Sequence, residues 1–197
     1  MNNKYLMTSI SLSLFVVTGC VFKEPYPSEW KAISTVPGEC PEISGTFSNS
    51  GELDPAEIEE DIVGDQFRQA TLSRIFFLGL EEAVPISHVE IIQSQSDEIR
   101  FIAWKENGAA FEKTFAARDK DFTCKSGFIE FVGDRECEVV EGIMACATPE
   151  AHFNRNNEGA LIMKYNSRGF GLVYLIPALV SEWHWYRFMP YQSNEAR

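Results

Sequence analysis

Closely spaced turn signals in the C-terminal half of the chain place the strongest limit on its fold. From Ser87 onward, short runs of β-branched and aromatic residues are separated by clusters of Gly, Asn, Asp and Ser, as at Asn166–Gly169. Because these connections are too short for helical crossovers, the strands are predicted to pair as an antiparallel meander. Strands are predicted at residues 43–48, 87–93, 98–105, 109–117, 127–132, 136–140, 143–148, 160–165, 171–176 and 182–188.

A sheet of this size must cover its apolar face, so we expect it to curl into a barrel-like domain or to fold into a sandwich. Phe128–Val132 and Leu172–Ile176 are apolar on nearly both faces. A helical segment at Leu72–Leu80 is the predicted cover for their second face. Further upstream, Asp54 as the N-cap and Pro55 at the first helical position predict the start of a helix. The predicted fold class is therefore mainly β with a short N-terminal helical insertion.

The first residues of the chain have the layout of an export signal. Lys4 and the free amine precede a short apolar run from Tyr5 to Val17, and two small residues follow. This run is shorter than the roughly 20 apolar residues that a membrane-spanning helix needs. The predicted organisation is a signal peptide at 1–19, a proline-bearing tether at 20–39 and a single domain at 40–197.

The end of this signal, Val17-Thr-Gly-Cys20, resembles the lipobox of bacterial lipoproteins. The resemblance implies that Cys20 receives a diacylglycerol, that the signal is cut before it, and that the new amine is acylated. Each acyl chain contributes about 0.8 kcal/mol per buried methylene, so two or more chains hold a protein stably on a membrane. Because Val21 rather than an aspartate follows the cysteine, the resemblance also implies attachment to the outer membrane, facing the periplasm of a Gram-negative bacterium. The alternative is a simple secretory signal with Cys20 as an ordinary thiol.

Four further cysteines, an even number in a chain with an export signal, predict two disulfides. If Glu141-Gly142 is a two-residue hairpin turn, Cys137 lies directly opposite Cys146, at a position where side chains come closest. Cys40 and Cys124 then remain as the second pair. Free thiols or a zinc site are the alternative, but no Cys-x-x-Cys pair is present.

Charge and motifs exclude several classes of function. The chain has a formal charge of −12, which becomes −13 when Lys4 leaves with the signal, and such acidity disfavours nucleic acid as a partner. His88, His152 and His184 lie far apart along the chain, with no metal-ligand spacing around them. No phosphate loop, nucleophile elbow or dinucleotide motif follows a predicted strand. We therefore expect no catalytic residue, metal or cofactor, with a hydrolase as the less favoured alternative.

The segment Trp183–Met189 is the most aromatic part of the chain. Alternation places Trp183, Trp185 and Arg187 on one face of a strand and the intervening residues on the other. The segment either closes the sheet and fills the core or forms the aromatic wall of a ligand cavity. Pro177–Val180 just before it is a predicted exposed apolar loop.

Three short motifs look like those of a group of uncharacterised proteobacterial envelope lipoproteins: Cys40-Pro-x-x-Ser-Gly-Thr-Phe47, Cys124-x-x-Gly127 and Trp185-Tyr-Arg-Phe188. More remotely, Gly45-Thr-Phe47 with the late Arg187 is similar to the calycin pattern of lipocalin-like barrels. That resemblance implies that Phe47 and Arg187 close a barrel, with the arginine packed across the ring.

The expected function is a non-catalytic, membrane-anchored envelope lipoprotein. Its domain would bind a small apolar ligand, with Phe47, Trp183, Trp185 and Arg187 as the candidate ligand or barrel-closing residues. The alternative role is that of a structural or assembly partner of an envelope protein.

Overall fold

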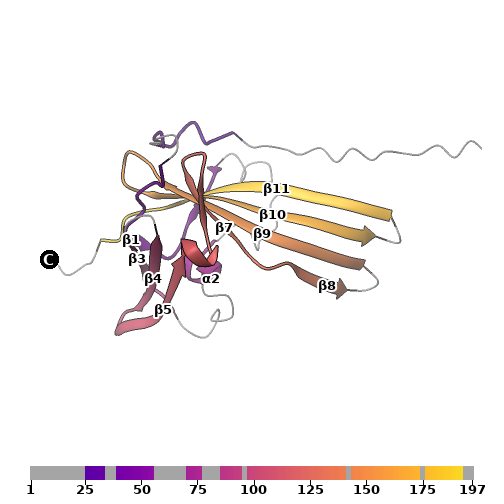
Figure 1. Ribbon diagram of the computed structural model, residues 1–197. Coiled ribbons are helices and arrows are strands. Elements are labelled where there is room, and N and C mark those ends of the chain that lie inside the picture. Colours follow the sequence, from indigo (N-terminus) through magenta and orange to yellow (C-terminus); the bar gives the residue numbers. More distant parts are fainter. Residues whose placement is uncertain are drawn as a thin grey trace, which may run out of the picture.

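The protein, seen in a computed structural model, is a mainly β, antiparallel domain built from two sheets (Figure 1). The structure describes residues 25–33, 39–55, 70–76, 85–94, 97–140, 143–173 and 176–192. Cys20 and the predicted signal peptide lie outside these ranges, as do residues 56–69, where a helix is predicted after Pro55. Within the described ranges, no helix combines the length and the apolar character that crossing a bilayer requires.

The first sheet contains four strands in the order β1-β3-β4-β5. Their residues alternate between the core and solvent, as in Val89, Ile91, Ile99 and Phe101, which are fully buried. The predicted strands of this region are confirmed. Their bounds are β1 Gly45–Ser48, β3 His88–Ser94, β4 Glu98–Lys105 and β5 Gly108–Ala116.

The second sheet has the order β2-β11-β10-β9-β7-β6, and β8 also pairs with β9. A 3-10 turn, η1 (Ala117–Asp119), connects the two sheets after β5. The strands are β2 Glu52–Leu53, β6 Thr123–Lys125, β7 Phe128–Val132, β8 Glu136–Val140, β9 Ile143–Arg155, β10 Leu161–Val173 and β11 Ile176–Phe188.

The main core lies where the two sheets face one another, as in a sandwich. Phe101 of the first sheet and Phe131 and Phe153 of the second belong to one buried cluster. The short helix α2 (Leu72–Phe76) adds Phe76, whose ring stacks on Phe101 with centroids 3.8 Å apart and lies 5.4 Å from Phe131. The predicted helical cover for the strand at Phe128–Val132 is therefore confirmed.

Two segments predicted to separate strands, one turn and one loop, are instead parts of strands. Asn166–Gly169 was expected to be a turn, but it lies inside β10, paired on one side with β9 and on the other with β11. Pro177–Val180 was expected to be a loop, but it forms the first part of β11. In both places, ladder pairing along strands of 13 residues overrides local turn preferences, which are weak when neighbours supply hydrogen bonds.

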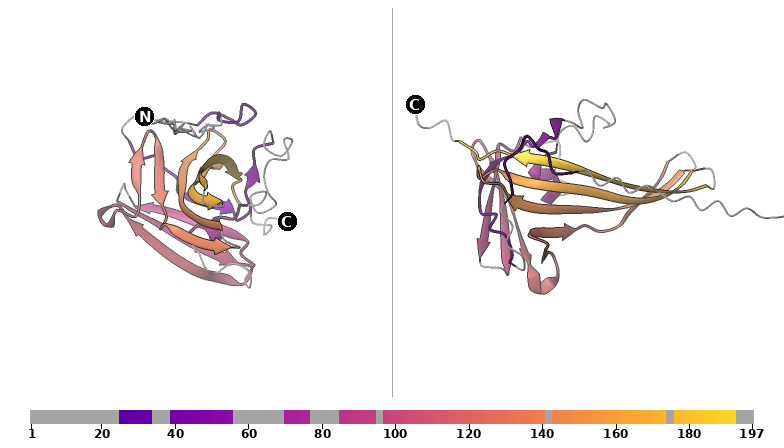
Figure 2. Two further views of the ribbon diagram at one scale, coloured as in Figure 1. Left: turned by 90° about the vertical axis from the view of Figure 1, so that its right-hand side faces the viewer. Right: turned by 90° about the horizontal axis from the view of Figure 1, so that it is seen from above.

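The prediction of a barrel is also wrong, because the second sheet does not close on itself. Its order ends at β2 on one side and at β6 on the other. The long strands β9, β10 and β11, with β8 beside them, instead run out of the two-sheet body as a projection (Figures 1 and 2). Residues 77–80 of the predicted helix and the side chains of residues 172–176 lie outside what the structure describes, so the predicted cover of Leu172–Ile176 stays a prediction.

Both predicted disulfides are present. Cys137 and Cys146 are direct cross-strand partners of β8 and β9, and they are bonded to each other. Cys40 is bonded to Cys124 in β6, with a sequence separation of 84 residues. The second bond ties the chain ahead of β1 to the outer hairpin of the second sheet.

Candidate functional site

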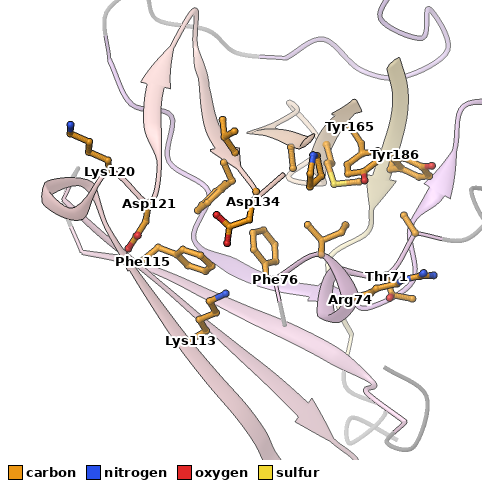
Figure 3. Close-up of a pocket in the computed structure, with 18 residues that line it drawn as sticks. Thr71, Arg74, Phe76, Lys113, Phe115, Lys120, Asp121, Asp134, Tyr165 and Tyr186 are labelled. Atoms are coloured by element: carbon orange, nitrogen blue, oxygen red, sulfur yellow. The ribbon is translucent and has the colours of Figure 1, made fainter. Parts of the chain in front are cut away.

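A cavity of about 680 Å³ opens between α2, the edge strand β5 and the core-facing side of the second sheet (Figure 3). The strand residues of the second sheet that line it include Phe131, Ala151, Met163, Tyr165 and Tyr186. The volume falls in the range of pockets that hold small molecules. The other lining residues are Ala70, Thr71, Arg74, Ile75, Phe76, Lys113, Phe115, Lys120, Asp121, Val132, Gly133, Asp134 and Pro149.

Aromatic rings form much of the wall of this cavity. Phe115 lies edge-on to Phe131 at 5.1 Å between centroids, and Phe76 is 6.0 Å from Phe115. Phe76 and Phe131 are buried, so they present an apolar surface that is fixed by packing on their other sides. Such a surface favours an apolar or aromatic ligand.

Charged residues surround the opening. Lys113 lies across from Phe101 in the register of β4 and β5, and its Nζ is 4.7 Å from the centroid of Phe115. Figure 3 shows Lys113, Phe115 and Phe76 around one space, with Arg74 and Lys120 at opposite ends of the opening. Three cations and two carboxylates thus line the cavity of an otherwise acidic protein.

The two carboxylates that line the cavity are Asp121 and Asp134. Asp121 Oδ2 accepts a hydrogen bond from the backbone N–H of Ala116 at 2.9 Å, which fixes the chain after β5. Among the described residues that line the cavity, none is a histidine or a cysteine. The aromatic and charged lining is suited to apolar contact and to charge recognition.

A second cluster lies on the opposite face of the second sheet. The registers place Glu130, His152, Lys164 and Trp185 in one cross-strand row. Lys164 is buried, with its Nζ 5.0 Å from the ring centroid of Trp185 and 4.3 Å from that of Trp183. These contacts hold a cation under indole rings, an arrangement that stabilises the charge without exposing it.

His152 in this row is neutral at pH 7. Two carboxylates lie near its ring, Glu130 at 3.5 Å and Glu150 at 3.9 Å, and these alone would favour protonation. Burial opposes the charged form, and the cations Lys164, Arg168 and Lys125 act in the same direction, so that the pKa of His152 falls to about 4. Burial and the three cations outweigh the two carboxylates because neither carboxylate is close enough for a strong hydrogen bond.

Trp183 and Trp185, predicted as ligand residues, therefore lie on the face away from the cavity. Trp185 packs in a small buried cluster with Trp30 and Ile162, which shows that the tether docks on the domain. The predicted alternation is confirmed, because the intervening Tyr186 faces the main core and lines the cavity.

Phe47 and Arg187, the pair expected from the calycin resemblance, have different partners. Phe47 is buried in the main core, and the guanidinium 5.8 Å from its ring centroid belongs to Arg155. Arg187 pairs with Glu52 at 2.6 Å and lies 5.2 Å from the ring centroid of Trp30. Arg187 therefore fastens the tether and β2 to β11.

The three histidines stay apart, as predicted. His88 stacks on Tyr191 with centroids 4.1 Å apart, His152 lies in the outer row, and His184 is buried in β11. Among the residues that the structure describes, no group of three or more His, Cys, Asp or Glu could hold a metal ion.

The cavity residues Phe76, Lys113 and Phe115 were not among the predicted site residues. A signal for Lys113 exists in the sequence, because alternation puts it on the same face of its strand as Phe111 and Phe115. A cation on an otherwise aromatic, core-facing side of a strand is unusual and indicates a site. Comparison of the chain with protein-family models, with curated proteins and with solved structures finds no match.

Proposed function

We propose that the protein is a non-catalytic envelope lipoprotein, held on a membrane through Cys20, whose domain binds a small apolar ligand with an acidic group. The proposal rests mainly on the aromatic cavity with Lys113 at its opening. The ligand site lies between two sheets rather than inside a barrel. Its apolar part would contact Phe76, Phe115 and Phe131, and its acidic group would lie near the ammonium of Lys113.

The chemistry of the lining favours binding over catalysis. A buried aromatic wall contributes about 25 cal/mol per Å² of apolar ligand surface that it removes from water. A single ammonium within about 4 Å of an anion adds about 1 kcal/mol when the pair remains wet. Together these contributions suit a reversible carrier or sensor of an amphipathic small molecule.

Neutralising Lys113 is expected to weaken ligand binding about fivefold, which corresponds to about 1 kcal/mol. The chain from residue 21 contains every described element, and the probe is 8-anilinonaphthalene-1-sulfonate, an aromatic anion followed by fluorescence titration. Lys113→Gln should raise the dissociation constant, whereas Lys31→Gln, the same change on the exposed tether, should leave it unchanged. Equal affinities for the two variants would contradict the proposed site.

Replacing Cys20 by alanine is expected to release the protein from the membrane, because the diacylglycerol and its acyl chains would be lost. Membrane and soluble fractions of cells that express each form would be compared by immunoblotting. Cys40→Ala, which removes a cysteine of the domain and leaves Cys20, serves as the control and should stay with the membrane. A Cys20→Ala protein that remained in the membrane fraction would exclude lipid anchoring.

A further inference from the structure

The four-stranded projection has one open edge that carries no charge. We define the projection as residues 136–140 of β8, 143–148 of β9, 168–173 of β10 and 176–181 of β11, which extend beyond the two-sheet body (Figures 1 and 2). β11 forms its outer edge, because β2 pairs with β11 only at Tyr186 and Arg187. In the part of the chain that the structure describes, no strand pairs with the outer edge of β11 from Ile176 to Ser181.

The outward backbone groups of this edge are identified by one hydrogen bond. The N–H of Asp54 donates to the carbonyl of Trp185 at 3.0 Å, from the side of β11 away from β10. Because backbone groups alternate along a strand, the N–H and C=O groups of residues 179, 181 and 183 also face outward. Residue 177 also faces outward by this alternation. A proline is tolerated there because no backbone N–H is needed on the side of the strand away from β10.

Charge distinguishes this edge from the other edge of the projection. Residues 169–181 contain no Asp, Glu, Lys or Arg, in a chain whose formal charge is −12. The strand at the other edge, β8, carries Glu136 and Glu138. Charges on an edge strand block pairing with another chain, whereas a long uncharged edge promotes it. The β11 edge is thus where two acidic copies can approach without like charges facing each other.

We propose that β11 pairs antiparallel with β11 of a second copy of this chain, so that the two projections form one continuous sheet around a two-fold axis. In a two-fold dimer, both copies use the same surface at the interface. An open edge strand can form such an interface, because it is complementary to a second copy of itself that runs antiparallel. In the uncharged part of β11, residues 177, 179 and 181 face outward, and because Pro177 offers only its carbonyl, these groups can form up to four interchain hydrogen bonds. This interaction goes beyond the proposed ligand binding and does not depend on the cavity.

Cysteine cross-linking of the membrane-bound, full-length protein tests the pairing. In the new ladder, residues 178, 180 and 182 occupy positions without backbone hydrogen bonds, where side chains on the two strands come closest. Ala178→Cys, Val180→Cys and Glu182→Cys are made one at a time, and Glu138→Cys on β8 is the control. Mild oxidation and non-reducing electrophoresis should give a covalent dimer in at least one β11 variant, the one nearest the axis, and none in the control.

A second variant separates pairing from folding. Leu179→Lys places a charge at the centre of the edge, so it should abolish the cross-link when it is combined with the reactive cysteine. Its far-ultraviolet circular dichroism should match that of the parent protein, because no ladder bond to β10 is removed. The proposal is overturned if no β11 cysteine yields a dimer, if Glu138→Cys cross-links equally, if Leu179→Lys leaves the dimer intact, or if the cross-linked band contains only a different protein.

Discussion

Removing the bond between Cys40 and Cys124 is expected to lower the free energy of unfolding by about 4.6 kcal/mol. The two cysteines are 84 residues apart, so the bond closes a long loop and restricts the unfolded chain strongly. In the folded protein it fastens the segment before β1 to the β6–β7 hairpin. Urea denaturation of the double variant Cys40→Ala/Cys124→Ala, in the chain from residue 21, measures the change.

The second disulfide provides a matched control. Cys137 and Cys146 are 9 residues apart, and they already face each other across a ladder, so their removal should cost only about 3 kcal/mol. The difference between the two double variants reports the effect of loop length. If loss of the short loop destabilised the protein more than loss of the long one, chain entropy would not be the main effect of these bonds.

The order of strands along the chain could be read from the sequence, because hydrophobic alternation and turns are local. The pairing of Cys137 with Cys146 followed from the same local geometry and is confirmed. The path of β10 could not be predicted, because Asn166–Gly169 has turn chemistry and is held straight only by the strands on both sides. Closure into a barrel also depends on contacts between distant strands, which a local pattern does not report.

The sequence predicted which residues share one face of a strand. It did not predict which other elements pack against that face. Alternation correctly separated Trp185 from Tyr186. The sequence does not say which of these faces meets the first sheet and α2, and the cavity lies on the side of Tyr186. Trp185 instead meets the tether through Trp30. A ligand wall predicted from aromatic content alone was therefore placed on the wrong side of the sheet.

Acidification from pH 7 to pH 5 is expected to lower the free energy of unfolding by about 2 kcal/mol through His152 alone. Its pKa is about 4 in the folded protein and about 6.5 in an unfolded chain. Between these values the unfolded state binds a proton that the folded state does not, so stability rises with pH. The contribution is complete above pH 6.5 and is lost progressively as the pH falls toward 4.

His152→Gln removes this titration and should flatten the stability profile between pH 4 and 6.5, measured by urea denaturation at each pH. The neighbouring charges Glu130, Glu150, Lys164, Arg168 and Lys125 remain, so their own effects cancel in the comparison with the parent protein. His88→Gln is the control: burial also lowers the pKa of His88, but that ring is less enclosed, and its removal should change the profile less. An unchanged slope in His152→Gln would mean that the pKa of His152 is the same in the folded protein as in the unfolded chain, which would contradict the lowered value.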